Sequence, residues 1–121
     1  MERKKIFVID DDVTVLRTLE ERLKTAGFDM IGTGNPLDAL TMAHEHHPDL
    51  IILDIVMPQM SGYELLDILK KDPSTKGIPV IILTVKNMAV DIEKGLKLGA
   101  GDYITKPLQM DLMIKRIERL L

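Results

Sequence analysis

The stretch Leu50-Ile51-Ile52-Leu53-Asp54 places four consecutive apolar residues directly in front of a carboxylate. A run of this length without a polar interruption predicts a strand that is covered on both faces, as in a parallel sheet. Two further runs have the same character, residues 6–9 before Asp10 and residues 80–83 before Thr84. The sequence therefore predicts a parallel sheet with polar side chains at the ends of its strands.

Segments with the helical spacing of apolar residues separate these strands. Residues 28–33 and 102–105 are weaker strand-like runs. Apolar and polar residues alternate in the first of them, which favours a strand at the edge of the sheet. Helices are expected from Val13 to Ala26, from Asn35-Pro36 to His47-Pro48, from Ser61 to a loop at residues 72–77, from Ala89 to near Gly99, and from about Gln109 to Leu121. Five strand–helix units joined by right-handed crossovers predict a doubly wound α/β fold with helices on both faces.

Length and composition narrow the class of protein further. The 121 residues fit one domain, residues 1–121, and 19 acidic against 16 basic residues with 3% aromatics argue against direct nucleic-acid binding. The absence of cysteine excludes disulfides, thiolate metal sites and a cysteine nucleophile. No apolar run approaches the ~20 residues of a membrane span, and residues 1–5 lead into a strand instead of a signal segment. We expect a soluble cytoplasmic protein without membrane contact.

Polar residues gather where the predicted strands end, which is where doubly wound sheets bind ligands. Asp10 and Asp11 follow the first strand, Asp54 the third, Thr84 the fourth and Lys106 the fifth. Neighbouring carboxylates repel one another unless positive charge lies between them, and oxygen-only ligands favour a hard divalent cation such as Mg²⁺. A carboxylate can also attack phosphorus and form an aspartyl phosphate, which an ammonium and a hydroxyl would stabilise.

Four stretches in order resemble the receiver domain of response regulators in bacterial two-component signalling. These stretches are VIDDD at residues 8–12, LDIVMPQMSG at 53–62, ILT at 82–84 and GDYITKP at 101–107. The resemblance covers essentially the whole chain, and the spacing of the stretches also fits the family. It implies a flavodoxin-like (βα)5 fold whose five-stranded parallel sheet has the order 2-1-3-4-5.

The resemblance implies a role for each matching acidic residue. Asp54 matches the phosphoacceptor, and Asp10 and Asp11 match the acidic pair that holds Mg²⁺ together with Asp54. The backbone carbonyl of Val56 would complete the metal ligands. The reaction implied for this chain is phosphoryl transfer onto its own Asp54 carboxylate. The protein is therefore expected to be a signalling phosphoacceptor and not an enzyme.

The remaining matches concern switching and partners. Thr84 and Tyr103 match the switch residues, Lys106 matches the phosphate-binding lysine, and the peptide bond before Pro107 is expected to be cis. The implied phosphoryl donor is a sensor histidine kinase or a phosphotransfer protein. The signal is expected to pass from this chain to an output domain or an effector protein. The face formed by the fourth helix, the fifth strand and the last helix is a candidate homodimer surface.

Two residues depart from the family pattern. Val85 replaces a usually small residue, and Val56 has no polar group to orient water, so we expect a long-lived phosphoryl group.

Two other functions stay open. A haloacid-dehalogenase-type enzyme also forms an aspartyl phosphate, but it carries a second aspartate where this chain has Val56. A phosphorylation-independent interaction domain is the other alternative, although such domains usually lose an acid or the lysine. Labelling by acetyl phosphate and turnover of phosphate monoesters separate the three.

Overall fold

A computed structural model describes residues 3–121, which form one sheet of five parallel strands in the order β2-β1-β3-β4-β5. The strands are β1 (Lys5–Ile9), β2 (Asp29–Thr33), β3 (Leu50–Leu53), β4 (Val80–Thr84) and β5 (Asp102–Thr105). The order confirms the flavodoxin-like arrangement, with the switch point between β1 and β3. The predicted domain and the predicted lack of a signal segment also involve Met1 and Glu2, and these two residues lie outside the described residues.

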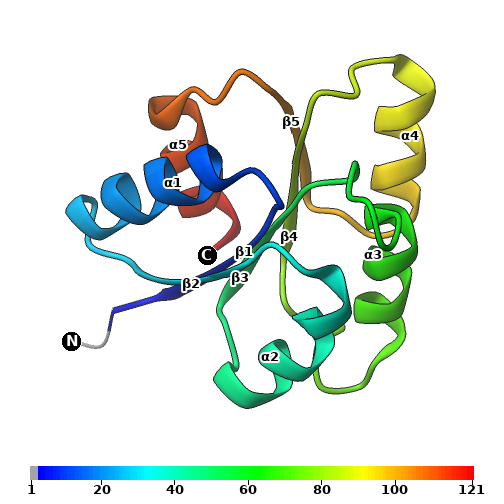
Figure 1. The fold of residues 1–121 in the computed structure, drawn as a ribbon, viewed down its shortest axis with the longest axis horizontal. Coiled ribbons are helices and arrows are strands. Elements are labelled where there is room, and N and C mark those ends of the chain that lie inside the picture. Colours follow the sequence, from blue (N-terminus) through cyan, green and yellow to red (C-terminus); the bar gives the residue numbers. More distant parts are fainter. Residues whose placement is uncertain (1–2) are drawn as a thin grey trace.

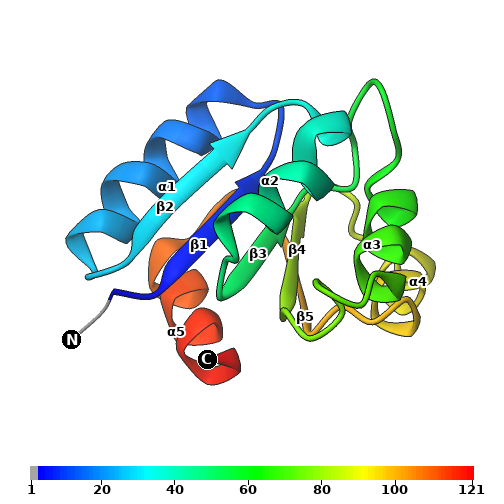
Figure 2. The same cartoon turned by 90° about the horizontal axis from the view of Figure 1, so that it is seen from below.

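Helices cover both faces of the sheet, as Figures 1 and 2 show. They are α1 (Val13–Thr25), the 3₁₀ helix η1 (Pro36–Asp38), α2 (Ala39–His46), α3 (Gly62–Lys71), α4 (Ala89–Lys97) and α5 (Met110–Leu120). Helices α1 and α5 lie on one side, and α2, α3 and α4 lie on the other (Figure 1). Within residues 3–121, no helix has both the length and the apolar character that a membrane crossing requires.

The central strands feed two apolar cores, one on each face of the sheet. Phe7 and Leu53 pack with residues of α2 and α3, whereas Val8 and Ile52 pack with residues of α1 and α5. Every residue of β3 and of β4 is buried. The uninterrupted apolar runs are therefore explained by cover on both faces, and polar side chains on these strands are confined to the ends.

Side-chain caps fix where several helices begin. The Asp12 carboxylate accepts hydrogen bonds from the amides of Thr14 and Val15 and so caps α1. The Asn35 side chain also acts as a cap, but the chain first makes a 3₁₀ turn there, and α2 begins only at Ala39. These two caps leave only three residues between β1 and α1 and two residues between β2 and η1.

Candidate functional site

The polar residues at the strand ends lie together at the carboxyl edge of the sheet. Asp10 directly follows β1, Asp54 directly follows β3, Thr84 is the last residue of β4, and Lys106 directly follows β5. Asp10, Asp54 and Thr84 are buried, while Asp11 is exposed. Strand β4 runs one residue further than the sequence predicts, because Thr84 still pairs with Thr105 of β5.

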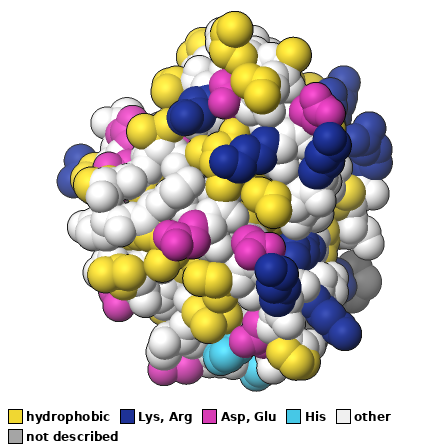
Figure 3. Space-filling view, turned by 90° about the vertical axis from the view of Figure 1, so that its right-hand side faces the viewer, with side chains coloured by type: hydrophobic (Ala, Val, Ile, Leu, Met, Phe, Trp, Pro, Cys, Tyr) yellow, Lys and Arg dark blue, Asp and Glu magenta, His cyan; other side chains and the backbone are white. Residues whose placement is uncertain are grey.

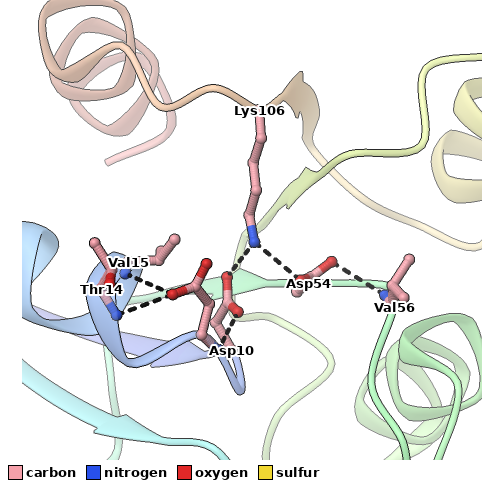
Figure 4. Close-up of polar contacts among 7 residues, drawn as sticks. Asp10, Thr14, Val15, Asp54, Val56 and Lys106 are labelled. Atoms are coloured by element: carbon pink, nitrogen blue, oxygen red, sulfur yellow. Dashed lines mark hydrogen bonds and ion pairs between the residues drawn. The ribbon is translucent and has the colours of Figure 1, made fainter.

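Lys106 joins the two buried carboxylates. Its Nζ lies 3.0 Å from Oδ2 of Asp10 and 3.1 Å from Oδ2 of Asp54 (Figure 4). Burial alone would lower the pKa of Lys106, but its contacts with the two carboxylates raise that pKa above its ordinary value. Lys106 is therefore a fixed positive charge within the site.

Backbone amides hold the other oxygen of each buried carboxylate. The amide of Asp12 donates to Oδ1 of Asp10 at 2.9 Å, and the amide of Val56 donates to Oδ1 of Asp54 at 3.0 Å. Burial raises the pKa of Asp10, and the neighbouring Asp54 adds to the rise, whereas the Asp12 amide and Lys106 oppose it. These bonds orient both side chains before any ligand binds.

Three carboxylates form a group that fits a divalent cation. One ligand oxygen from each of Asp10, Asp11 and Asp54 lies within 4.8 Å of the others. Lys106 contacts two of these carboxylates, so its single positive charge leaves the group with an excess of negative charge. Oxygen ligands of this kind, with no histidine or cysteine in the group, match the preference of Mg²⁺. Val56 follows in the loop after Asp54, and this residue is 46% exposed.

Gly62 allows the loop between β3 and α3 to fold closely over the end of β3. Its amide donates to the carbonyl of Ile55 at 2.9 Å. A Cβ at this position would overlap the carbonyl oxygen of Asp54 and lie 2.5 Å from Cα of Ile55. A glycine before a helix has many explanations in a sequence, and this close approach exists only in three dimensions, so the residue pattern alone does not reveal the role of Gly62.

The expected switch residues occupy distinct environments. The Thr84 hydroxyl has no hydrogen-bond partner among the described residues. The Tyr103 hydroxyl donates to the backbone carbonyl of Lys86 at 2.8 Å, in the loop before α4. The Lys106–Pro107 peptide bond is cis. Thr84 thus lies inside the site beside β5, whereas the Tyr103 hydroxyl is held outside it by the loop.

Comparison with known proteins identifies the family. A profile for the "Response regulator receiver domain" matches residues 6–118. The chain belongs to this family. Receiver domains of response regulators are signalling proteins of two-component systems, and receivers generally bind Mg²⁺ at the acidic site.

Relatives and solved structures agree with this assignment. The "DNA-binding response regulator MtrA" of Mycobacterium tuberculosis is 37% identical over 115 residues, which are 95% of this chain and 49% of MtrA. The chain spans about half the length of the curated relatives it matches. The name of MtrA includes DNA binding, which contrasts with the expectation of no direct nucleic-acid contact.

Two solved structures confirm the receiver fold. The chemotaxis protein CheY4 of Vibrio cholerae has a TM-score of 0.93 at 25% identity and covers 99% of this chain and 100% of its own. The receiver domain of a signal transduction histidine kinase from Syntrophus aciditrophicus has a TM-score of 0.88 at 35% identity, with coverages of 98% and 89%.

Proposed function

We propose that residues 1–121 form one receiver domain that accepts a phosphoryl group on Asp54 in a Mg²⁺-dependent reaction. The observation that supports this proposal most directly is the position of Lys106, which contacts both Asp54 and Asp10 beside an acidic group with excess negative charge. The donor is a phosphohistidine of a sensor histidine kinase or of a phosphotransfer protein.

In this reaction an oxygen of the Asp54 carboxylate attacks phosphorus, and the phosphorus–nitrogen bond of the donor breaks. The electron pair stays on the imidazole nitrogen, which takes a proton from solvent. Lys106 places its ammonium against the phosphoryl oxygens in exchange for part of its contact with Asp54. Asp10, Asp11, Asp54 and the carbonyl of Val56 would hold Mg²⁺, which would supply the further positive charge that the phosphoryl group requires.

The Thr84 hydroxyl, which has no hydrogen-bond partner in residues 3–121, is the group that would respond to phosphorylation. A phosphoryl oxygen offers it a hydrogen-bond acceptor, and its movement frees space into which Tyr103 turns. The result is a shift between two packings of α4, β5 and α5, which control an output or a homodimer. Beryllofluoride should therefore change NMR shifts on this face, and unchanged shifts would contradict the switch.

The relatives favour one kind of output. MtrA is a DNA-binding response regulator, so we propose that this receiver controls transcription in the cytoplasm through a DNA-binding output domain or effector. The receiver itself, with a formal net charge of −3, would not contact DNA directly.

Mass spectrometry after incubation with acetyl phosphate and Mg²⁺ tests the acceptor. The protein should gain one phosphoryl group as acetate leaves, and Asp54→Asn should abolish this gain. Asp67→Asn is the matched control, because it removes an exposed carboxylate of α3 that pairs only with Lys71 among the ion pairs of the described residues. Labelling that persists in Asp54→Asn would place the acceptor on another residue.

A further inference from the structure

Two phenol hydroxyls from different elements hold the beginning of α4. The Tyr103 hydroxyl of β5 donates to the carbonyl of Lys86 at 2.8 Å, and the Tyr63 hydroxyl of α3 donates to the carbonyl of Asp91 at 3.0 Å. Lys86 lies in the loop before α4, and Asp91 lies in the first turn of α4. The two bonds therefore fix both sides of the point where this helix begins.

Little else among the described residues secures this point. Residues 85–90 are all exposed, and Met88 at the N-cap makes no side-chain capping bond. Gly95 is the only buried residue of α4. Because an uncapped first turn with few packing contacts opens readily, the two hydroxyl bonds carry an unusual share of the local stability.

Tyr63 is well placed to act as a rigid support. Tyr63 is 8% exposed and belongs to the core beneath α3, while Nζ of Lys94 in α4 lies 4.5 Å from the ring centroid. Burial raises the pKa of Tyr63, and burial together with the neighbouring Tyr63 raises the pKa of Tyr103. Both phenols therefore stay protonated and can donate at physiological pH.

We propose that Tyr63 is a positioning residue that latches α4 in its unmodified arrangement. Its bond to the Asp91 carbonyl holds the first turn where Tyr103 can reach Lys86. A rearrangement of Tyr103 that moves the loop must work against this latch. This second part rests on the proposed phosphoacceptor function, whereas the latch itself is a property of the unmodified protein.

Amide hydrogen exchange of the unmodified protein tests the latch. Tyr63→Phe removes the hydroxyl and keeps the ring, so we expect exchange at residues 86–95 to rise about threefold to tenfold, as for the loss of one hydrogen bond. Exchange in α1 and α5 should stay unchanged. Thr75→Val is the matched control, because it removes a buried hydroxyl that donates to the Leu69 carbonyl at 2.6 Å, away from α4.

Two further measurements separate the hydroxyl from the ring and the latch from the phosphoacceptor function. Lys94→Met removes the ammonium over the ring and keeps the Tyr63 bond, so exchange at residues 86–95 should remain near that of the wild type. Titration with beryllofluoride and Mg²⁺ should show about threefold to tenfold tighter binding to Tyr63→Phe than to the wild type. In the wild type, part of the binding free energy is used to break the Tyr63 bond, which the variant lacks.

Each result decides a different point. Wild-type exchange at residues 86–95 in Tyr63→Phe, or an equal change in Thr75→Val, would make Tyr63 a packing residue and overturn the latch. Faster exchange in Lys94→Met equal to that in Tyr63→Phe would also overturn it, because the ring contact would then hold the helix. A wild-type protein that binds no beryllofluoride would contradict the phosphoacceptor function and leave the exchange result standing.

Discussion

The Thr84 hydroxyl is completely buried at the end of β4 and has no hydrogen-bond partner among the described residues. Burial of an unpartnered hydroxyl costs about 1–3 kcal/mol. Thr75 is equally buried, but its hydroxyl donates to the Leu69 carbonyl at 2.6 Å. The two threonines therefore form a natural pair, one with a hydroxyl that destabilises the unmodified fold and one with a hydroxyl that stabilises it.

Replacement of each threonine by the nearly isosteric valine should have opposite effects. Thr84→Val should leave the free energy of unfolding unchanged or raise it by about 1 kcal/mol, whereas Thr75→Val should lower it by about 1 kcal/mol. Urea unfolding of the unmodified proteins measures both values. A loss in Thr84→Val as large as that in Thr75→Val would mean that the Thr84 hydroxyl has a partner in solution.

Val56 is the residue at which we expect the lifetime of the phosphoryl group to be set. Its amide donates to Asp54 and the residue is 46% exposed, so we expect it to lie where water would approach the phosphorus. Val56→Asn adds a polar group that can orient this water, and dephosphorylation should become at least about tenfold faster. Val85 is 62% exposed and less constrained, so Val85→Ala should accelerate the reaction less.

The decay of the phosphorylated protein after removal of acetyl phosphate provides this measurement. Leu37→Asn is the control, because Leu37 is also an exposed apolar residue and lies in η1. If Val56→Asn decays no faster than the Leu37 variant, the side chain at position 56 does not control access of water.

Helix α4 has an apolar side that faces away from the sheet. Ala89, Ile92 and Leu96 have the spacing of one helical face, yet Ala89 and Leu96 are exposed. Figure 3 shows hydrophobic side chains among lysines and acidic residues on the surface of this side of the molecule. Periodicity predicted that a helix forms here, but the side that meets the sheet is determined by the close contact at Gly95, which periodicity does not reveal.

Gly95→Ala should therefore destabilise the protein. Alanine in a helix interior is normally better than glycine by about 0.5–1 kcal/mol. Here a Cβ would lie 2.5 Å from Cδ1 of Ile82 and 3.2 Å from Cδ2 of Tyr103, so either the fully buried Ile82 side chain must change its rotamer or α4 must move outward. Overpacking of this kind costs about 1–3 kcal/mol, which exceeds the gain in helix propensity.

Thermal or urea unfolding measures this balance, and Gly77→Ala is the control. A Cβ at Gly77 has no heavy atom within 4 Å, so that variant should be neutral. Gly95→Ala should also shift the NMR signals of Tyr103, because its ring contacts the new methyl group. A Gly95 variant more stable than the wild type would show that α4 is free to adjust.

Over the whole molecule, local patterns predicted the elements and long-range geometry decided the details of the site. All five strands were predicted within one residue of their observed ends, because buried parallel strands have a strong apolar signal. The convergence of Asp10 and Asp54 followed from the parallel arrangement of their strands. The bridging position of Lys106 and the bond from Tyr63 to α4 depend on how loops and helices pack, and a tyrosine in a helix is otherwise indistinguishable from a core residue.

The acidic site should also couple Mg²⁺ to the stability of the whole fold. Asp11 and Asp54 come together only when β1 and β3 pair, so a cation that binds them binds the folded chain. At a concentration tenfold above its Kd, such a cation raises the free energy of unfolding by about 1.4 kcal/mol. Urea unfolding in MgCl2, against NaCl of equal ionic strength, should show this gain in the wild type.

Two neighbouring aspartates provide a matched test of this coupling. Asp11→Asn should lose most of the Mg²⁺-dependent stability, because it removes one of the three clustered carboxylates. Asp12→Asn removes the same charge one residue later but should keep the gain, since Asp12 caps α1 and asparagine caps equally well. Equal losses in both variants would mean that Mg²⁺ only screens the acidic surface, because a bound cation requires the carboxylate of Asp11 in particular, whereas screening requires only a negative charge at either position.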